Sequence, residues 1–100
     1  MKAVLQDELE KRWGEMFAAL AAGDDVAPSA RLRAEGMMEA VVLSGIASTD
    51  ALVAAMNVSY ESVNGKGIEE DFGVDWQVFF PFPQIPAMAK RAPVYPSTKD

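Results

Sequence analysis

Carboxylates are the side chains in this sequence that most readily suggest chemistry. They form three groups, namely Asp7/Glu8/Glu10, Glu35/Glu39 and Glu69/Glu70/Asp71/Asp75. Acids four residues apart share a helix face and can jointly hold a hard cation such as Mg²⁺. Such a site needs acids from several helices facing one another, whereas Arg31, Glu35 and Glu39 follow one another at intervals of four residues on one helix face. We therefore interpret Glu35 and Glu39 as a solvated, salt-bridging face, and we predict no metal site.

The side chains that most often serve as catalytic bases or nucleophiles are absent or isolated. The sequence has no histidine and no cysteine, which removes the commonest general base near neutral pH and all thiolate chemistry. Gly65-Lys66-Gly67 lacks the glycine spacing and the Ser/Thr of a phosphate-binding loop. The serines lack a recognisable nucleophile setting. We predict a non-catalytic protein with no catalytic, cofactor-binding or metal-binding residues.

Residues 52–63 contain a motif that suggests a function other than catalysis. Residues 52–63 resemble the helix-turn-helix core of bacterial repressors, with a small residue early, Asn57 where the turn usually has glycine, and then Val58-Ser59 and a later valine. Asparagine tolerates the left-handed conformation that such a turn requires. The resemblance implies an alternative function, DNA binding by residues 48–66. The DNA-contacting residues would then be Ser59, Asn64 and Lys66.

The same stretch departs from that pattern in its charges. The would-be recognition helix carries Glu61 and no basic residue before Lys66, although DNA readers usually place basic or amide side chains there. An unbroken helix explains the stretch as well, because four apolar residues recur on one face. These are Val53, Met56, Tyr60 and Val63. We favour the unbroken helix and keep DNA binding as the alternative.

The charge is unevenly distributed along the chain. The net charge is −6, with −8 on residues 1–78 and +2 on residues 79–100. An acidic body repels the phosphate backbone that supplies most nucleic-acid affinity. We therefore do not expect a nucleic-acid partner. The body can instead attract the basic tail, either of its own chain or of a neighbouring copy.

Apolar periodicity predicts an all-α fold. Residues spaced three and four apart indicate helices over 4–22, 28–44 and 49–64, with glycine-containing turns at Gly23, Gly45 and Gly65 as stops. Gly36 lies inside the second helix, where glycine costs about 1 kcal/mol relative to alanine. We interpret Gly36 as a point of close helix crossing.

The pattern changes after Gly73. Trp76, Val78, Phe80 and Phe82 alternate with other residues, and five of the six prolines follow position 80. Alternation together with proline indicates an extended segment. We predict a helical domain over 1–74 and an extended, proline- and aromatic-rich arm over 75–100, packed on its own domain or on a partner subunit. The candidate partner-binding residues are Trp76, Phe79, Phe80, Phe82, Ile85 and Tyr95.

These features together favour an interaction protein. Aromatic residues of an arm are too apolar to remain in water, and pairing across a two-fold axis would satisfy its backbone groups. We expect a homodimer that self-associates through helix faces and the arm, with an unidentified protein as a further partner. No apolar run is long enough to span a membrane. We expect no membrane partner and a cytoplasmic location.

Overall fold

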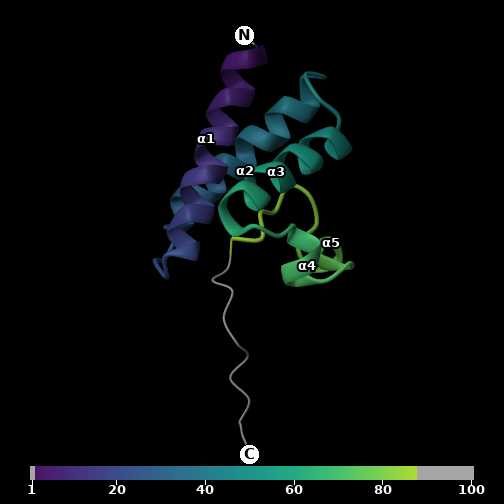
Figure 1. Ribbon diagram of the computed structural model, residues 1–100. Helices are drawn as coiled ribbons and strands as arrows, with labels where there is room; N and C mark the ends of the chain where they lie inside the picture. The colour runs from purple at the N-terminus through teal and green to yellow at the C-terminus, as the bar shows by residue number, and fades with distance from the viewer. Residues whose placement is uncertain (1, 88–100) are drawn as a thin grey trace, which may run out of the picture.

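The architecture is a bundle of three long helices followed by two short ones (Figure 1). The structure, a computed structural model, describes residues 2–87. Its helices are α1 (Lys2–Ala21), α2 (Pro28–Leu43), α3 (Thr49–Asn64), α4 (Ile68–Phe72) and α5 (Trp76–Phe79). No strand occurs in that range. The predicted all-α class is confirmed, and the three predicted helices match α1 to α3 within two residues at each end.

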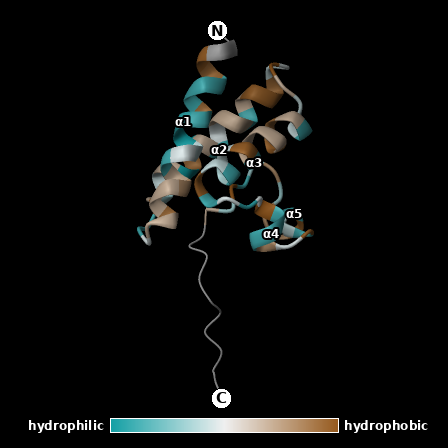
Figure 2. Ribbon diagram, viewed as in Figure 1, coloured by the Kyte–Doolittle hydropathy of each residue, from teal (hydrophilic) through white to brown (hydrophobic). Residues whose placement is uncertain are grey.

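Helix α1 is the centre of the bundle, because it packs against both α2 and α3 (Figure 1). Residues spaced three and four apart along α1 are buried, so that its apolar stripe faces the other two helices. The buried core side chains of the long helices are Leu9, Trp13, Met16, Phe17, Ala34, Met38, Val41, Leu52, Met56 and Tyr60. The Phe17 and Tyr60 rings meet edge to face, with centroids 5.0 Å apart. Figure 2 shows hydrophobic and hydrophilic residues following one another in turn along the long helices.

The ends of α2 and α3 follow the predicted glycine stops, and a serine caps the start of α3. Gly45 is left-handed, and the Ile46 N–H bonds the Val41 carbonyl at 3.0 Å, which is a Schellman ending. The Ser48 hydroxyl caps α3 by accepting from the Ala51 N–H at 3.1 Å. Gly65 is left-handed and ends α3. Local sequence therefore defines where each long helix stops.

The prediction that Gly36 marks a close crossing is wrong. Gly36 is exposed, and a Cβ added there would meet nothing within 4 Å. Helix α2 instead places Ala34, Met38 and Val41 in the core. The glycine is therefore not required by packing in the described part of the chain.

The extended conformation predicted after residue 75 is wrong over Trp76–Phe79, which form the helical turn α5. The Phe80 N–H donates to the Trp76 carbonyl at 2.9 Å. Trp76 and Phe80 are four residues apart, so the same alternation also suits one helix face. Residues beyond Phe80 follow turns, and Gln84 N–H bonds the Pro81 carbonyl at 2.9 Å.

The described part of the arm, residues 75–87, packs on its own chain. Trp76 and Ile85 belong to the same buried cluster as the side chains of α1, α2 and α3. Residues 88–100, including Tyr95, lie outside the described range. Within the described range, each helix is too short or too polar to cross a lipid bilayer.

Candidate functional site

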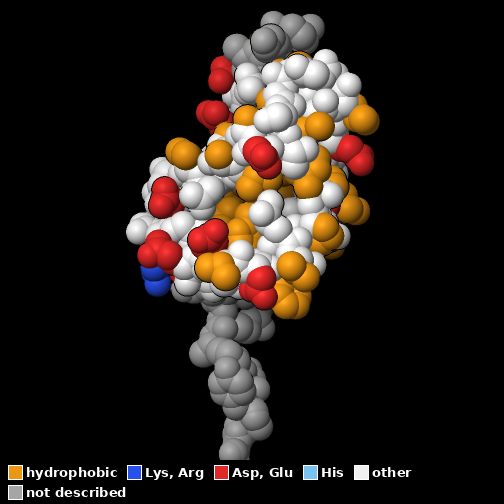
Figure 3. Space-filling view, turned by 90° about the vertical axis from the view of Figure 1, so that its right-hand side faces the viewer, with side chains coloured by type: hydrophobic (Ala, Val, Ile, Leu, Met, Phe, Trp, Pro, Cys, Tyr) orange, Lys and Arg blue, Asp and Glu red, His pale blue; other side chains and the backbone are white. Residues whose placement is uncertain are grey.

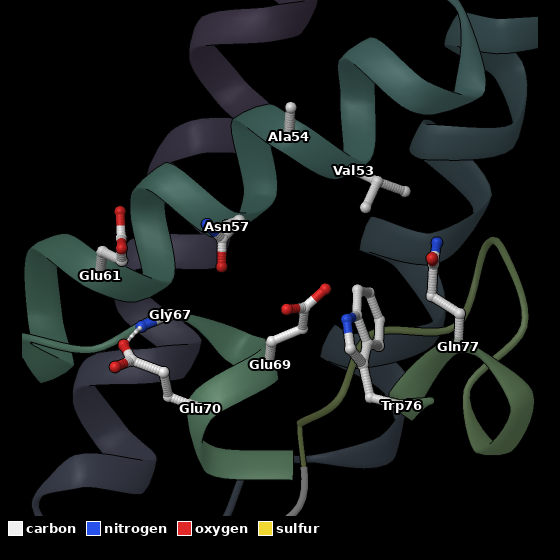
Figure 4. A pocket seen from close by; sticks show the side chains of 9 residues that line it. All are labelled: Val53, Ala54, Asn57, Glu61, Gly67, Glu69, Glu70, Trp76 and Gln77. Carbon is white, nitrogen blue, oxygen red and sulfur yellow. Dashed lines mark hydrogen bonds between the residues drawn. The ribbon is translucent and has the colours of Figure 1, made fainter. Parts of the chain in front are cut away.

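An open groove lies between α3 on one side and α4 and α5 on the other (Figure 4). Its volume is about 380 Å³. The lining residues are Val53, Ala54, Asn57, Glu61, Gly67, Glu69, Glu70, Trp76 and Gln77. The groove therefore combines an aromatic ring, three carboxylates and two primary amides.

Trp76 forms one wall of this groove. The residue is only 6 % exposed, and in Figure 4 its indole nitrogen faces the side on which Glu69 lies. No hydrogen bond among the described residues uses that N–H, and no dashed line reaches it in Figure 4. Among the described residues, the buried side-chain polar atom that lacks a hydrogen-bond partner is the Trp13 Nε1, so the Trp76 N–H is accessible from the groove rather than sealed in the core. The groove thus presents an accessible donor.

The carboxylates give the groove a negative potential. Glu61 and Glu69 are exposed and form no ion pair with any residue in 2–87. Glu70 is already engaged, because its Oε1 accepts from the Gly67 N–H at 2.9 Å (Figure 4). Two carboxylates are therefore available to a cationic group.

The groove is held by contacts between α3 and the start of α4. The Asn57 Oδ1 accepts from the Ile68 N–H at 2.8 Å. Gly67 is buried beside it, and an added Cβ would lie 3.2 Å from that same oxygen and 3.5 Å from the Glu61 Oε2. The missing side chain of Gly67 thus leaves room for Asn57, whose side chain holds the start of α4 beside α3.

A second connection between α3 and α4 runs through Tyr60. Its hydroxyl donates to the Asp71 carboxylate, and the Lys66 Nζ lies 3.5 Å from the other Asp71 oxygen. Burial raises the pKa of Tyr60 above its ordinary value, and the hydrogen bond to Asp71 and the Asp71 charge add to the increase. The phenol is therefore a structural donor at neutral pH.

An apolar patch is exposed next to the groove. Val74, Val78 and Phe79 are 82 %, 74 % and 67 % exposed, and we call these three residues the α5 patch. Figure 3 looks onto the side of the molecule where α5 lies in Figure 1. Hydrophobic and acidic side chains intermix on that face, and a basic side chain is visible only at one edge.

Glu35 holds the chain after α5, which the sequence analysis missed. The predicted solvated face is wrong for this residue, because Glu35 is 7 % exposed. Its Oε2 accepts from the Ile85 N–H at 2.8 Å and from the Arg31 guanidinium at 3.0 Å. The carboxylate thereby satisfies a buried backbone donor fifty residues away. No local signal could have revealed that, since the contact depends on the tertiary fold.

The predicted partner-binding residues separate into distinct environments. Trp76 and Ile85 are buried, Phe80 and Phe82 are half-buried against the core, and Phe79 is exposed. Tyr95 lies outside the described residues. The α5 patch therefore retains one of these aromatic residues, and sequence reasoning missed Val74 and Val78 because isolated valines carry no distinguishing signal.

The residues of the DNA-binding alternative lie on or just after one continuous helix. Residues 49–64 form α3 without interruption, so the unbroken helix is confirmed and Asn57 does not form a turn. The Asn64 amide donates to the Tyr60 carbonyl at 3.1 Å, and Lys66 is paired with Asp71. Ser59 is half-buried. DNA binding stays an alternative prediction, although residues 49–64 do not form a helix-turn-helix.

The groove can bind a ligand that has a hydrogen-bond acceptor for the Trp76 N–H and a positive charge for the carboxylates of Glu61 and Glu69. In residues 2–87, no three acidic side chains are placed to hold a metal ion. Comparisons with protein-family models, with curated proteins and with solved structures found no match.

Proposed function

We propose that this chain is a non-catalytic, cytoplasmic interaction protein that self-associates, most simply as a homodimer, through the face carrying α5. The observation that carries the proposal is the α5 patch. Three large apolar side chains within six residues of sequence are exposed on a fold that buries Trp13, Phe17 and Met38 almost completely. Clustered exposed apolar side chains beside polar residues are typical of protein–protein contact sites.

The burial of Trp76 explains why the α5 patch is exposed to solvent. Trp76 is turned into the groove and the core, so the remaining positions of the short helix α5 face outward. Covering Phe79 and its two valine neighbours would stabilise a complex by about 25 cal/mol for each Å² of apolar surface removed from water. A second copy offers the same apolar surface, and a two-fold interface is self-complementary.

Light scattering tests the proposal. The full chain should show a mass that rises from monomer toward dimer with concentration, and Phe79→Ser should weaken this association. The change is at an exposed site, so the fold should survive. Leu43→Ser is the matched control, because Leu43 is 83 % exposed but lies at the end of α2.

Two outcomes contradict the proposal. One is a monomeric mass for the full chain at every concentration. The other is a dimer that Phe79→Ser leaves unchanged, which would place the contact elsewhere on the surface.

A further inference from the structure

The α5 patch is too small to be a complete interface. A stable protein–protein contact buries about 800 Å² on each partner, and three side chains cannot supply that area. The groove adjoins the α5 patch in sequence, because Trp76 and Gln77 lie between Val74 and Val78. An interface that starts at the α5 patch therefore has the groove as its natural continuation.

The groove's unused groups define what it can bind. The Trp76 N–H is accessible from the groove and can donate to an acceptor there, and the carboxylates of Glu61 and Glu69 favour a cation. An extended basic peptide has both, because its carbonyls are free of internal hydrogen bonds and its side chains carry charge. Proline-rich peptides meet this requirement best, since the polyproline II conformation leaves the backbone unpaired and docks in aromatic-lined grooves.

The C-terminal end of this chain has that composition. Lys90 and Arg91 are followed by Pro93-Val94-Tyr95-Pro96, within the thirteen residues 88–100. At about 3.1 Å per residue in the polyproline II conformation, this length could extend about 40 Å. The segment starts from Ala87, which lines a separate pocket with Arg31 and Phe80. Basic tail and acidic groove are complementary in charge.

We propose that residues 88–100 of one copy bind in the groove of a second copy, with Lys90 and Arg91 against Glu61 and Glu69 and a main-chain carbonyl accepting from the Trp76 N–H. This inference rests on the proposed self-association and names its second contact. In a two-fold dimer the exchange is reciprocal, so each copy both supplies a tail and receives one. The covered area then extends from the α5 patch across the groove.

The first experiment measures binding of a fluorescently labelled synthetic peptide with the sequence of residues 88–100. The receptor is the full chain carrying Lys90→Glu and Arg91→Glu, whose own tail no longer competes. Anisotropy should saturate with added receptor. Adding Glu61→Gln and Glu69→Gln to the receptor should weaken binding about tenfold, and Trp76→Phe should weaken it as well while keeping an aromatic ring.

The control variant carries Glu10→Gln and Glu15→Gln, two exposed acids on α1. It has the same change in net charge as the groove variant and should bind the peptide as the unaltered receptor does. Circular dichroism melting of the Trp76→Phe receptor checks that the fold is retained. No saturable binding, or equal weakening by groove and control variants, would overturn the inference.

The second experiment tests whether the tail of one copy binds in the groove of another copy. The Lys90→Glu/Arg91→Glu chain has an intact groove, and a Glu61→Lys/Glu69→Lys chain has an intact basic tail. Each alone should self-associate at least about tenfold more weakly than the original chain, and their equimolar mixture should recover part of the loss. A mixture no better than either variant alone would contradict exchange between copies.

The two proposals fail differently. If the original chain is monomeric throughout, self-association itself is wrong. If it is a dimer and both charge variants have unchanged mass, the groove is not part of the interface while self-association stands.

Discussion

Two positions in the same apolar segment, Ile85 and Phe79, have opposite environments. Ile85 is 1 % exposed and belongs to the core, whereas Phe79, six residues earlier, points into solvent. Both are large hydrophobic residues, and hydrophobicity alone does not separate them. At Ile85 the backbone is anchored as well, because its N–H donates to the Glu35 carboxylate inside the fold. The Phe79 side chain is left exposed and is available to a partner.

The largest expected effect tests this contrast directly. Ile85→Ala should lower the free energy of unfolding by about 2–5 kcal/mol, because it removes buried methyl groups and leaves a cavity. Phe79→Ala should change it by no more than about 0.5 kcal/mol in the monomer, as is usual for surface positions. Urea denaturation at low protein concentration measures both. Similar losses for the two variants would contradict the assignment of Phe79 to the exposed class.

Replacing the anchor should have the next largest effect. Glu35→Ala leaves the Ile85 N–H buried without its acceptor, which should cost about 1–3 kcal/mol. Glu35→Gln keeps an acceptor oxygen and loses only the ion pair with partly exposed Arg31, worth about 0–1 kcal/mol. Hydrogen exchange at the Ile85 amide should accelerate in the alanine variant and much less in the glutamine variant. Equal rates in both would mean that Glu35 does not anchor this segment.

A smaller effect concerns the tie that holds α4 beside α3. Tyr60→Phe removes the hydrogen bond to Asp71 and should cost about 1 kcal/mol at neutral pH. The folded state keeps the phenol protonated beyond the usual pKa of about 10, while the unfolded chain ionises there. Stability should therefore fall as pH rises above about 10, and Tyr60→Phe should remove that part of the fall. Denaturation profiles that coincide in slope above pH 10 would contradict this role.

The smallest expected effect is a gain. Gly36→Ala adds a methyl group at an exposed helical position with free space, and should stabilise the fold by about 0.5–1 kcal/mol through helix propensity. Thermal melting would show a modest increase in Tm. Destabilisation would mean that a neighbour packs closely on Gly36, as the sequence had suggested.

Local signals in the sequence were sufficient to predict the long helices. Gly45 and Gly65 act through hydrogen bonds and backbone conformations that involve only nearby residues, so their positions define helix ends. The short helix α5 was missed because Trp76 and Phe80 satisfy both an alternating and a helical pattern. The prolines that follow this segment favoured the prediction of an extended conformation, although residues 76–79 are helical.

The groove and the Glu35 anchor could not be predicted from local pattern. The groove joins Asn57 and Glu61 to Glu69 and Trp76, which come together only when α4 folds back along α3. Arg31 and Glu35 show the spacing of a surface ion pair, and nothing near them signals the arrival of Ile85. Tertiary contacts between distant segments, rather than composition, create both features.

The central claim is that the α5 patch becomes covered when copies associate. The chain has no cysteine, so Val78→Cys introduces a single thiol on α5 whose reaction rate with a maleimide reagent reports its exposure. The rate should fall as protein concentration rises from low micromolar to near millimolar, while the rate of a Leu43→Cys control stays constant. A Val78→Cys rate that is the same at every concentration would contradict the claim.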